Sequence, residues 1–344
     1  MTSLEAYLED WAGGRRARRD VAVTVAAIAR AAATLSGLVA QGPLAGAMGA
    51  VIGASSDGDG QKLLDLRAHA LFLDALTAVP AVGAIASEES LAPVVLCEGA
   101  PIAVALDPLD GSNNVELNAP LGVVFALLPA TGYGDARDPF LQPGHRQLAA
   151  GFVVFGPHTA LMLTLGEGVA MFTLEPASGE FRLTRNGMRI PPSAREYAIN
   201  AANRRHWHPP VRAFVDECLA GAEGPRGANF NTRWLGCVVA EAFRILTRGG
   251  VYLYPGDARD GYRRGRLRLV YEANPLALLT EQAGGAATDG FERILDLVPD
   301  ALHQRVPLIF GAREEVARIM ALHMEGMPQR GGAPLFAQRG LFRA

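Results

Sequence analysis

The chain has few cysteines and little net charge, and each shortage excludes a class of protein. Its 344 residues include three cysteines, Cys97, Cys218 and Cys237, without paired spacing. An odd, scattered set does not predict a disulfide framework and favours a reducing compartment, so we expect a cytoplasmic protein. The formal net charge of −3 gives no electrostatic reason to expect a nucleic-acid partner.

Long apolar runs and several catalytic motifs are also missing. The longest stretch without charge, residues 31–56, is rich in Ala and Gly and is interrupted by Gln41-Gly42-Pro43, so we expect no membrane segment. The acidic first ten residues do not resemble a signal peptide. The Walker A, nucleophile-elbow and dinucleotide-binding glycine patterns are absent, which argues against nucleotide hydrolysis and serine-hydrolase chemistry.

The most informative segment is acidic. Residues 107–114 read Asp-Pro-Leu-Asp-Gly-Ser-Asn-Asn and follow the apolar run 102–106, a pattern that predicts a buried strand leading into a loop. The carboxylates of Asp107 and Asp110, beside the backbone amides of Gly111 and Ser112, suit Mg²⁺ and phosphate. Taken alone, the segment fits an ordinary turn capped by Asp107 equally well.

Other acidic residues also follow apolar runs. Glu88 and Glu89 come after residues 79–86, and Glu272 follows the alternating segment 267–270. Asp59 and Asp65 flank Lys62 in a glycine-rich region. The end of an apolar strand is where open α/β sheets collect their ligands. Each segment alone is more often a solvated helix start or a capping box, but together they favour a metal and phosphate site.

Periodicity predicts a mixed chain that is long enough for two domains. We expect a helix over residues 20–40 with Asp20 as its N-cap, a mobile loop over 41–60 and a helix over 61–77. Strands are predicted at 94–106, 121–128, 149–155, 160–165 and 169–174. Helices at 210–222 and 236–248 then alternate with strands at 250–254, 267–271 and 306–310.

Ordered blocks of sequence between about residues 20 and 325 carry a resemblance to a known family. The blocks are residues 58–65, 87–89, 107–114, 233–236, 249–255, 266–275 and 281–285, together with Asn200. They resemble class I fructose-1,6-bisphosphatase, within the lithium-sensitive sugar-phosphatase superfamily. The resemblance implies a layered αβαβα sandwich, with an α+β domain over 1–190, an α/β domain over 191–327, the active site between them, and a flexible tail over 328–344.

The resemblance also implies a reaction and a set of site residues. The reaction is metal-dependent hydrolysis of the 1-phosphate of fructose 1,6-bisphosphate to fructose 6-phosphate, in gluconeogenesis or the Calvin cycle. Each subunit of a homotetramer would hold about two or three Mg²⁺ ions, with Mn²⁺ as an alternative.

The implied metal ligands are Glu88, Asp107, the Leu109 carbonyl, Asp110 and Glu272. The implied catalytic residues are Asp65, which assists proton removal from water, Glu89, which positions that water, and Asp59, on a closing loop. The implied substrate-binding residues are Asp110, Gly111, Ser112, Asn200, Tyr254, Arg266 and, from a neighbouring subunit, Arg233.

Three departures from the family pattern affect the sugar end of the site. Asn203 and Trp234 stand where the family has tyrosines, and Arg266 replaces a lysine. Arginine and lysine are not interchangeable at a tight site, so these changes leave the length of the bound sugar open. Sedoheptulose 1,7-bisphosphate, which is one carbon longer, is therefore a second candidate substrate. An inositol-phosphatase-like enzyme would not need Asn200 and the Arg233 segment. A non-catalytic sugar-phosphate sensor would be expected to lack one of the metal-binding acids.

A regulatory AMP site found in many members of the family is not evident here. Its phosphate lies at the start of an N-terminal helix, which we expect near Asp20, where the acid would oppose an anion. Its lysine–tyrosine pair and its arginine have no counterparts at Ala100-Pro101 and Leu128-Pro129. We therefore expect an enzyme that is insensitive to AMP.

Overall fold

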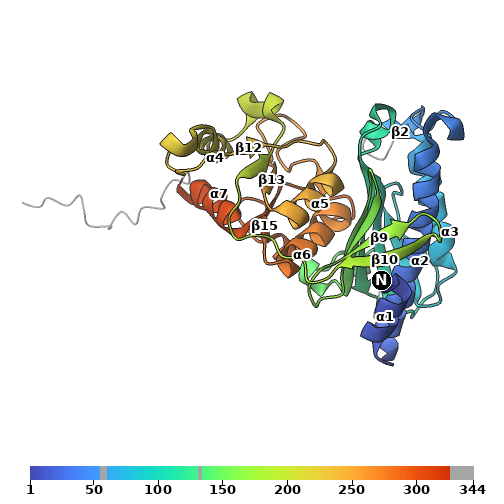
Figure 1. Cartoon of the computed structure of the whole chain (residues 1–344). Coiled ribbons are helices and arrows are strands. Elements are labelled where there is room, and N and C mark those ends of the chain that lie inside the picture. The colour runs from blue at the N-terminus through green and yellow to red at the C-terminus, as the bar shows by residue number, and fades with distance from the viewer. Residues whose placement is uncertain (55–59, 131–133, 326–344) are drawn as a thin grey trace, which may run out of the picture.

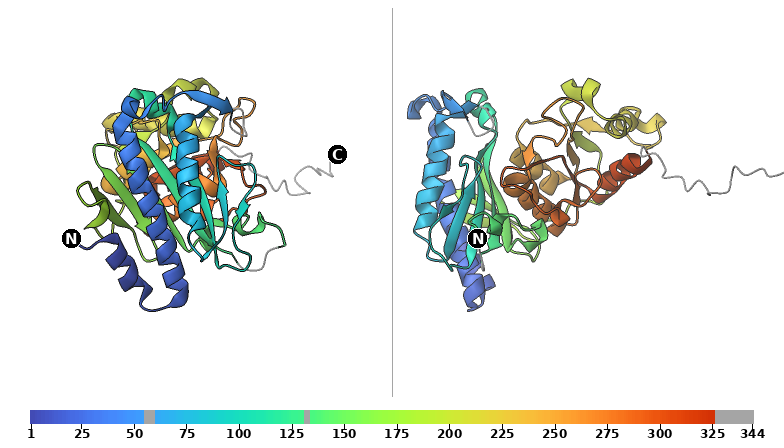
Figure 2. Two further views of the ribbon diagram at one scale, coloured as in Figure 1. Left: turned by 90° about the vertical axis from the view of Figure 1, so that its right-hand side faces the viewer. Right: turned by 180° about the vertical axis from the view of Figure 1, so that it is seen from behind.

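In the computed structural model, layers of helices alternate with two β-sheets (Figure 1). The structure describes residues 1–54, 60–130 and 134–325. Helices α1 (Leu4–Ala12), α2 (Arg16–Gln41) and α3 (Leu63–Thr77) form the first layer. Figure 2 shows them side by side across the larger sheet. This order of layers confirms the αβαβα sandwich.

The larger sheet has eight strands in the order β10-β9-β8-β7-β6-β5-β3-β4. The strands are β3 (Val82–Ser87), β4 (Val94–Val95), β5 (Ile102–Asp110), β6 (Leu121–Pro129), β7 (Ala149–Phe155), β8 (Thr159–Thr164), β9 (Ala170–Glu175) and β10 (Glu180–Arg185). Neighbours are antiparallel except β3 and β5, which are parallel. The central strands β5, β6 and β7 are buried nearly throughout because helices cover both faces.

The smaller sheet has five strands in the order β12-β11-β13-β17-β15. They are β11 (Glu196–Ala198), β12 (Asn231–Thr232), β13 (Val251–Tyr254), β15 (Ala286–Thr288) and β17 (Leu308–Gly311). Helices α5 (Val238–Arg248) and α6 (Asn274–Gln282) lie between the two sheets, and α4 (Pro209–Leu219) and α7 (Arg313–Glu325) cover the outer face (Figure 1). The apolar side chains of α5 and α6 therefore join both sheets in one core.

Two short antiparallel pairings lie outside these two sheets. Strand β1 (Val51–Ala54) pairs with β2 (Gly60–Lys62) ahead of α3, and β14 (Leu267–Arg268) pairs with β16 (Arg305–Val306). A π-helix, η7 (Leu269–Ala273), follows β14 and leads into α6. By length and composition α2 could cross a membrane, but about half of the helix is buried against its neighbours, which is typical of a core helix.

Several local predictions were wrong. The first long helix begins at Arg16, so Asp20 lies inside it and Arg15 is the N-cap, because arginine and alanine extend a helix readily. The segment 94–106 forms two strands, β4 and β5, separated by a turn at Gly99 with φ +85°. Strands β3 and β10 of the larger sheet and β11, β12 and β15 of the smaller sheet were missed. The segment expected as a loop over 41–60 contains a short 3₁₀ helix at Gly42–Ala45 and strand β1. Strand β5 continues through Asp110 instead of ending before Asp107, and residues 269–271 form a π-helix instead of a strand.

Candidate active site

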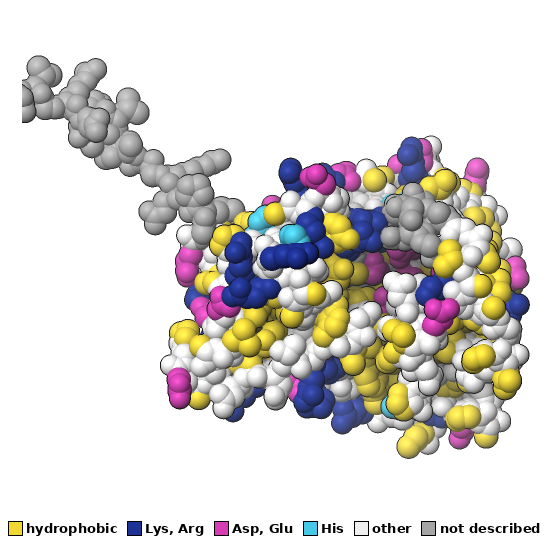
Figure 3. Space-filling view, turned by 90° about the horizontal axis from the view of Figure 1, so that it is seen from above, with side chains coloured by type: hydrophobic (Ala, Val, Ile, Leu, Met, Phe, Trp, Pro, Cys, Tyr) yellow, Lys and Arg dark blue, Asp and Glu magenta, His cyan; other side chains and the backbone are white. Residues whose placement is uncertain are grey.

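Three carboxylates converge where β5 ends beside the π-helix η7. Asp107 and Asp110 come from β5 and Glu272 from η7, and one oxygen of each lies within 4.8 Å of the others. Asp107 and Glu272 are buried, and Asp110 is partly buried. Figure 3 shows acidic side chains at the floor of a hollow, next to basic side chains. Residues 165 positions apart in the sequence thus form one acidic cluster.

Hydrogen bonds fix each of these carboxylates. Oδ1 of Asp107 accepts the Leu109 N–H at 3.0 Å, and Oε2 of Glu272 accepts the Arg268 N–H at 2.6 Å. Oδ2 of Asp110 accepts the Val239 N–H at 2.9 Å and the Cys237 thiol at 3.0 Å. Since Val239 lies in the first turn of α5, Asp110 caps that helix and benefits from its positive end.

The acids destabilise one another when they are ionised. Burial, reinforced by mutual repulsion, raises the pKa of Glu88, Asp107 and Glu272 well above the usual values. Burial also raises the pKa of Asp110, although its hydrogen bond from Val239 opposes the shift. Bound divalent cations would remove this repulsion, and clustered carboxylates are the hard oxygen ligands that Mg²⁺ and Mn²⁺ prefer. The donor set therefore fits a divalent metal.

A second pair of acids lies directly after β3, the strand next to β5. Nε of Arg268 lies 3.5 Å from Oε1 of Glu88, and the side-chain amide of Gln61 donates to Glu89. Nδ1 of His69 lies 3.0 Å from Oγ of Ser87, and Nε2 of His69 lies 3.3 Å from Oγ of Ser90. The imidazole ring of His69 thus joins the two ends of the turn that carries Glu88 and Glu89.

Asp65 has the properties of a general base. It lies in the first turn of α3, where Oδ2 accepts the Lys62 N–H at 2.7 Å. Its side chain is 3% exposed, and Oδ1 is buried without a hydrogen-bond partner within the described residues. Burial is the main cause that raises the pKa of Asp65 to about 6. A carboxylate with this pKa and one unpaired oxygen can accept a proton near neutral pH.

The backbone of the loop after β5 passes very close to the side chain of Cys237. Gly111 has φ +79°, and a Cβ there would lie 2.9 Å from Sγ of Cys237. The short helix η2 (Ser112–Leu117) follows it. Nζ of Lys62 donates to the carbonyl oxygen of Ser112 at 2.8 Å, and Lys62 is the only lysine in the 344-residue sequence. The one lysine side chain of the sequence therefore lies beside the candidate phosphate loop.

A second polar site lies in the smaller sheet. Asn200, Asn203 and Tyr254 line one pocket together with Arg259. The guanidinium carbons of Arg259 and Arg266 lie 4.0 and 5.0 Å from the ring centre of Tyr262. Asn200 and Tyr254 therefore share one pocket, and Arg266 lies against the same Tyr262 ring as the pocket residue Arg259.

Arg233 lies apart from that pocket on the same chain. It pairs with Glu196, with 3.5 Å between Nε and Oε1. The neighbouring Trp234 ring lies 6.2 Å from the ring of Tyr254. Arg233 thus does not line the pocket of Asn200 and Tyr254, although the next residue contacts Tyr254, and its side chain is turned toward Glu196.

Of the site residues expected from the sequence, the structure brings Asp107, Asp110 and Glu272 together and places Asn200 and Tyr254 in a separate pocket. Asp59 lies outside the described residues. The sequence reasoning missed Arg268, Cys237, His69 and Lys62, which hold the acids or the phosphate loop. No local spacing announces these contacts, because the His69 side chain reaches Ser87 and Ser90 and the Arg268 side chain reaches Glu88, all far away in the sequence.

Comparisons with known proteins agree with this geometry along the whole chain. The family model described as "Fructose-1-6-bisphosphatase, N-terminal domain" matches residues 2–186, and the model of the C-terminal domain matches residues 190–324. A class 1 fructose-1,6-bisphosphatase of Nitrobacter hamburgensis is 54% identical over 99% of this chain and 98% of its own length. One from Rhodopseudomonas palustris strain HaA2 is 53% identical over the same shares.

Solved structures show the same similarity. The holo form of Leishmania major fructose-1,6-bisphosphatase superimposes with a TM-score of 0.87 and 31% identity, covering 94% of this chain and 99% of that one. The apo form gives a TM-score of 0.83 with 30% identity over the same shares. The chain belongs to the class 1 fructose-1,6-bisphosphatases.

Proposed function

We propose that the chain hydrolyses the 1-phosphate of fructose 1,6-bisphosphate, giving fructose 6-phosphate and phosphate, with Mg²⁺ as its cofactor. The observation that carries the proposal is the cluster of Asp107, Asp110 and Glu272, whose oxygens lie within 4.8 Å of one another. Hydrolysis of a phosphate monoester is among the slowest uncatalysed reactions, so strong neutralisation of the phosphoryl oxygens is needed.

The acidic residues have separate roles in this proposal. Glu88, Asp107, Asp110, Glu272 and the Leu109 carbonyl hold the cations. When bound, the cations neutralise the phosphoryl oxygens and make a coordinated water more acidic. Glu89 orients the attacking water, and the unpaired Oδ1 of Asp65 accepts its proton. The bond between phosphorus and the sugar oxygen breaks as the bond to water forms.

The phosphates would be held at two places. The backbone amides of Gly111 and Ser112 cradle the 1-phosphate, and the nearby Lys62 ammonium adds positive charge. Asn200 and Tyr254, which line one pocket, together with Arg266 bind the sugar and its 6-phosphate, the distal phosphate. Arg233 of a neighbouring subunit completes that site in a homotetramer. Because Asn203 is shorter than a tyrosine, sedoheptulose 1,7-bisphosphate is the second candidate substrate.

The proposal extends to organisation and location. Residues 1–190 form a metal-binding domain, residues 191–327 a substrate domain and residues 328–344 a tail that lies outside the described residues. The enzyme works in the cytoplasm, in gluconeogenesis or the Calvin cycle. Asp59, expected on a closing loop, also lies outside the described residues.

A phosphate-release assay tests the proposal. Fructose 1,6-bisphosphate, sedoheptulose 1,7-bisphosphate and inositol 1-phosphate are each supplied with Mg²⁺ and then with excess chelator. We expect rapid release from the first substrate, reversible loss of activity on chelation, and little release from inositol 1-phosphate. Full activity in chelator, or preference for inositol 1-phosphate, contradicts the proposal.

A further inference from the structure

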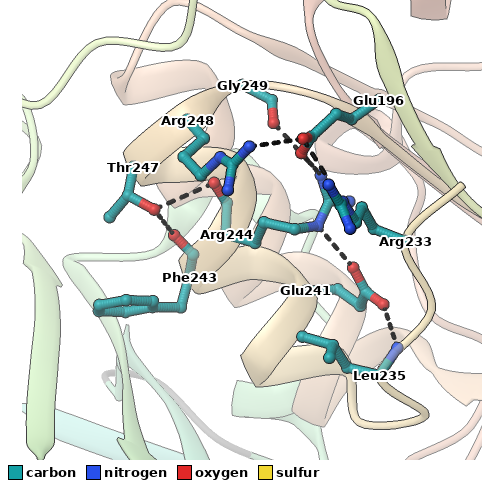
Figure 4. A network of polar contacts seen from close by, with 9 residues as sticks. All are labelled: Glu196, Arg233, Leu235, Glu241, Phe243, Arg244, Thr247, Arg248 and Gly249. Atoms are coloured by element: carbon teal, nitrogen blue, oxygen red, sulfur yellow. Dashed lines mark hydrogen bonds and ion pairs between the residues drawn. The ribbon is translucent and has the colours of Figure 1, made fainter. Parts of the chain in front are cut away.

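A group of ion pairs surrounds Glu196 beside Arg233 (Figure 4). The Glu196 side chain is 13% exposed. Its Oε1 lies 2.7 Å from Nη2 of Arg248 and 3.5 Å from Nε of Arg233, and its Oε2 lies 3.1 Å from Nη1 of Arg244. One mostly buried carboxylate therefore has three arginine partners.

A second carboxylate fixes this group from inside the protein. Glu241 is fully buried, and its Oε2 accepts from Nε of Arg244 at 3.0 Å. Its Oε1 accepts the Leu235 N–H at 2.7 Å. Arg244 thus bridges Glu241 and Glu196, which connects α5 to the segment that carries Arg233 (Figure 4). Removing Glu241 would leave the Leu235 N–H and Nε of the buried Arg244 without their acceptor, so this part of the arrangement is strongly determined.

The backbone at Arg233 is fixed independently of its side chain. The Arg233 N–H donates to the Tyr197 carbonyl at 2.8 Å, and the Trp234 ring stacks on Tyr252 with 5.8 Å between ring centres and 3° between planes. The Arg233 side chain is 50% exposed. A long, half-exposed arginine loses much rotamer freedom when it binds a ligand. A contact that orders it beforehand lowers that cost.

The charges of the group favour an anion. Three guanidinium groups, those of Arg233, Arg244 and Arg248, face the two carboxylates of Glu196 and Glu241, which leaves one positive charge in excess. The contact to Arg233 is made through Nε, and therefore uses one edge of the guanidinium group. The fork of terminal nitrogens is the part that matches phosphate geometry.

We propose that Glu196 is the positioning residue of Arg233. It holds Nε and thereby orders the guanidinium group for the distal phosphate of the sugar bisphosphate. The inference rests on the proposed role of Arg233 in binding that phosphate. Glu196 itself touches no substrate.

A double-mutant cycle tests this inference. In the full chain with Mg²⁺, Glu196→Gln should raise KM for fructose 1,6-bisphosphate about three- to tenfold and leave kcat within about twofold. The same substitution in an Arg233→Ala background should change KM little, because the positioned group is gone. Arg248→Gln is the matched control, since it removes a neighbouring partner of Glu196 but keeps the contact to Arg233, and KM should stay within about twofold.

Fructose 1-phosphate separates positioning from general damage, since it lacks the distal phosphate. Glu196→Gln should leave kcat/KM for this substrate within about twofold. If Glu196→Gln does not fold, Glu196→Asp carries the test, because it keeps the charge for Arg244 and shortens the reach toward Arg233. A lowered or unchanged KM, or an equal loss with fructose 1-phosphate, overturns the inference. If Arg233→Ala itself leaves KM unchanged, the proposed distal role of Arg233 fails instead.

Discussion

Replacing Asp65 with asparagine should make the protein more stable and nearly inactive. The Asp65 side chain is 3% exposed, and burial is the main cause that raises its pKa from 3.8 to about 6. At pH 8 the group is ionised in both the folded and the unfolded chain. Since one pKa unit corresponds to about 1.4 kcal/mol, its ionisation costs the folded state about 3 kcal/mol.

The asparagine substitution removes this cost but introduces another. The amide oxygen of the new side chain can still accept the Lys62 N–H. The NH₂ group replaces Oδ1 of Asp65, an atom that has no hydrogen-bond partner within the described residues. An unpaired buried amide costs about 1 to 2 kcal/mol, which leaves a net gain of about 1.5 kcal/mol. With an unfolding entropy of about 2.1 cal/mol/K per residue, Tm should rise by about 2 °C.

The pH dependence gives the prediction its sign. An acid with a raised pKa binds its proton more tightly in the folded chain, so the stability from Asp65 is present below about pH 4 and lost as the pH rises to about 6. The advantage of Asp65→Asn should therefore be largest at pH 8 and vanish or reverse near pH 4. Calorimetry in chelator at both pH values measures it, with Asp74→Asn, an exposed acid on the same helix, as the control.

Activity gives the other half of the test. Loss of the proton acceptor should lower kcat in Mg²⁺ by about 10²- to 10⁴-fold, while Asp74→Asn keeps the rate of the unmodified enzyme. A Tm difference that does not change with pH would refute the electrostatic reasoning. An Asp65→Asn enzyme with normal kcat would refute the role of Asp65 as a base.

Three further outcomes follow from the acidic cluster, from Arg233 and from the N-terminal segment. Adding Mg²⁺ to chelator-treated protein should raise Tm by several degrees at pH 8, because the ion relieves the repulsion between buried carboxylates. Asp110→Asn should reduce this rise in Tm. A rise that is equal in both proteins counts against the site. Arg233→Ala should raise KM at least tenfold, with kcat within about threefold, and analytical ultracentrifugation should find a tetramer; a monomer with normal KM would exclude a shared site. AMP up to about 1 mM should leave the rate unchanged in a titration of the Mg²⁺-loaded enzyme, because Ala100-Pro101 and Leu128-Pro129 provide no cation or aromatic ring; half-inhibition at micromolar AMP would contradict this.

The sequence predicted the metal-binding acids better than the backbone that carries them. An apolar run followed by Asp107 and Asp110 was recognisable, but the strand continues through Asp110 because its pairing with β6 resumes at Gly122. Glu272 was expected after a strand and lies in a π-helix, a local widening that single-sequence periodicity does not reveal. The apolar pattern of a sequence indicates which residues are buried. It does not indicate where a strand ends or a π-helix forms, because both depend on contacts with distant segments.

Partners that come from distant segments were beyond the reach of the sequence. Asp110 is held by the first turn of α5, 129 residues further along the chain at Val239. The group around Glu196 combines residues of β11, α5 and the 233–235 segment. Nor could the start of α2 at Arg16 be read from capping residues, since Arg15 makes no side-chain cap. Each of these features depends on tertiary packing, which overrides local preference.

The single lysine has a practical consequence for studies of assembly. Lys62 is 7% exposed, and its Nζ is bound to the Ser112 carbonyl. Apart from the terminal amino group, an amine-reactive cross-linker therefore has no accessible lysine with which to join two copies of the chain. The absence of cross-linked species with such reagents would carry no information about subunit number. Carboxylate-directed coupling is better suited, because exposed Asp and Glu side chains such as Glu5, Glu98 and Asp260 lie on the surface.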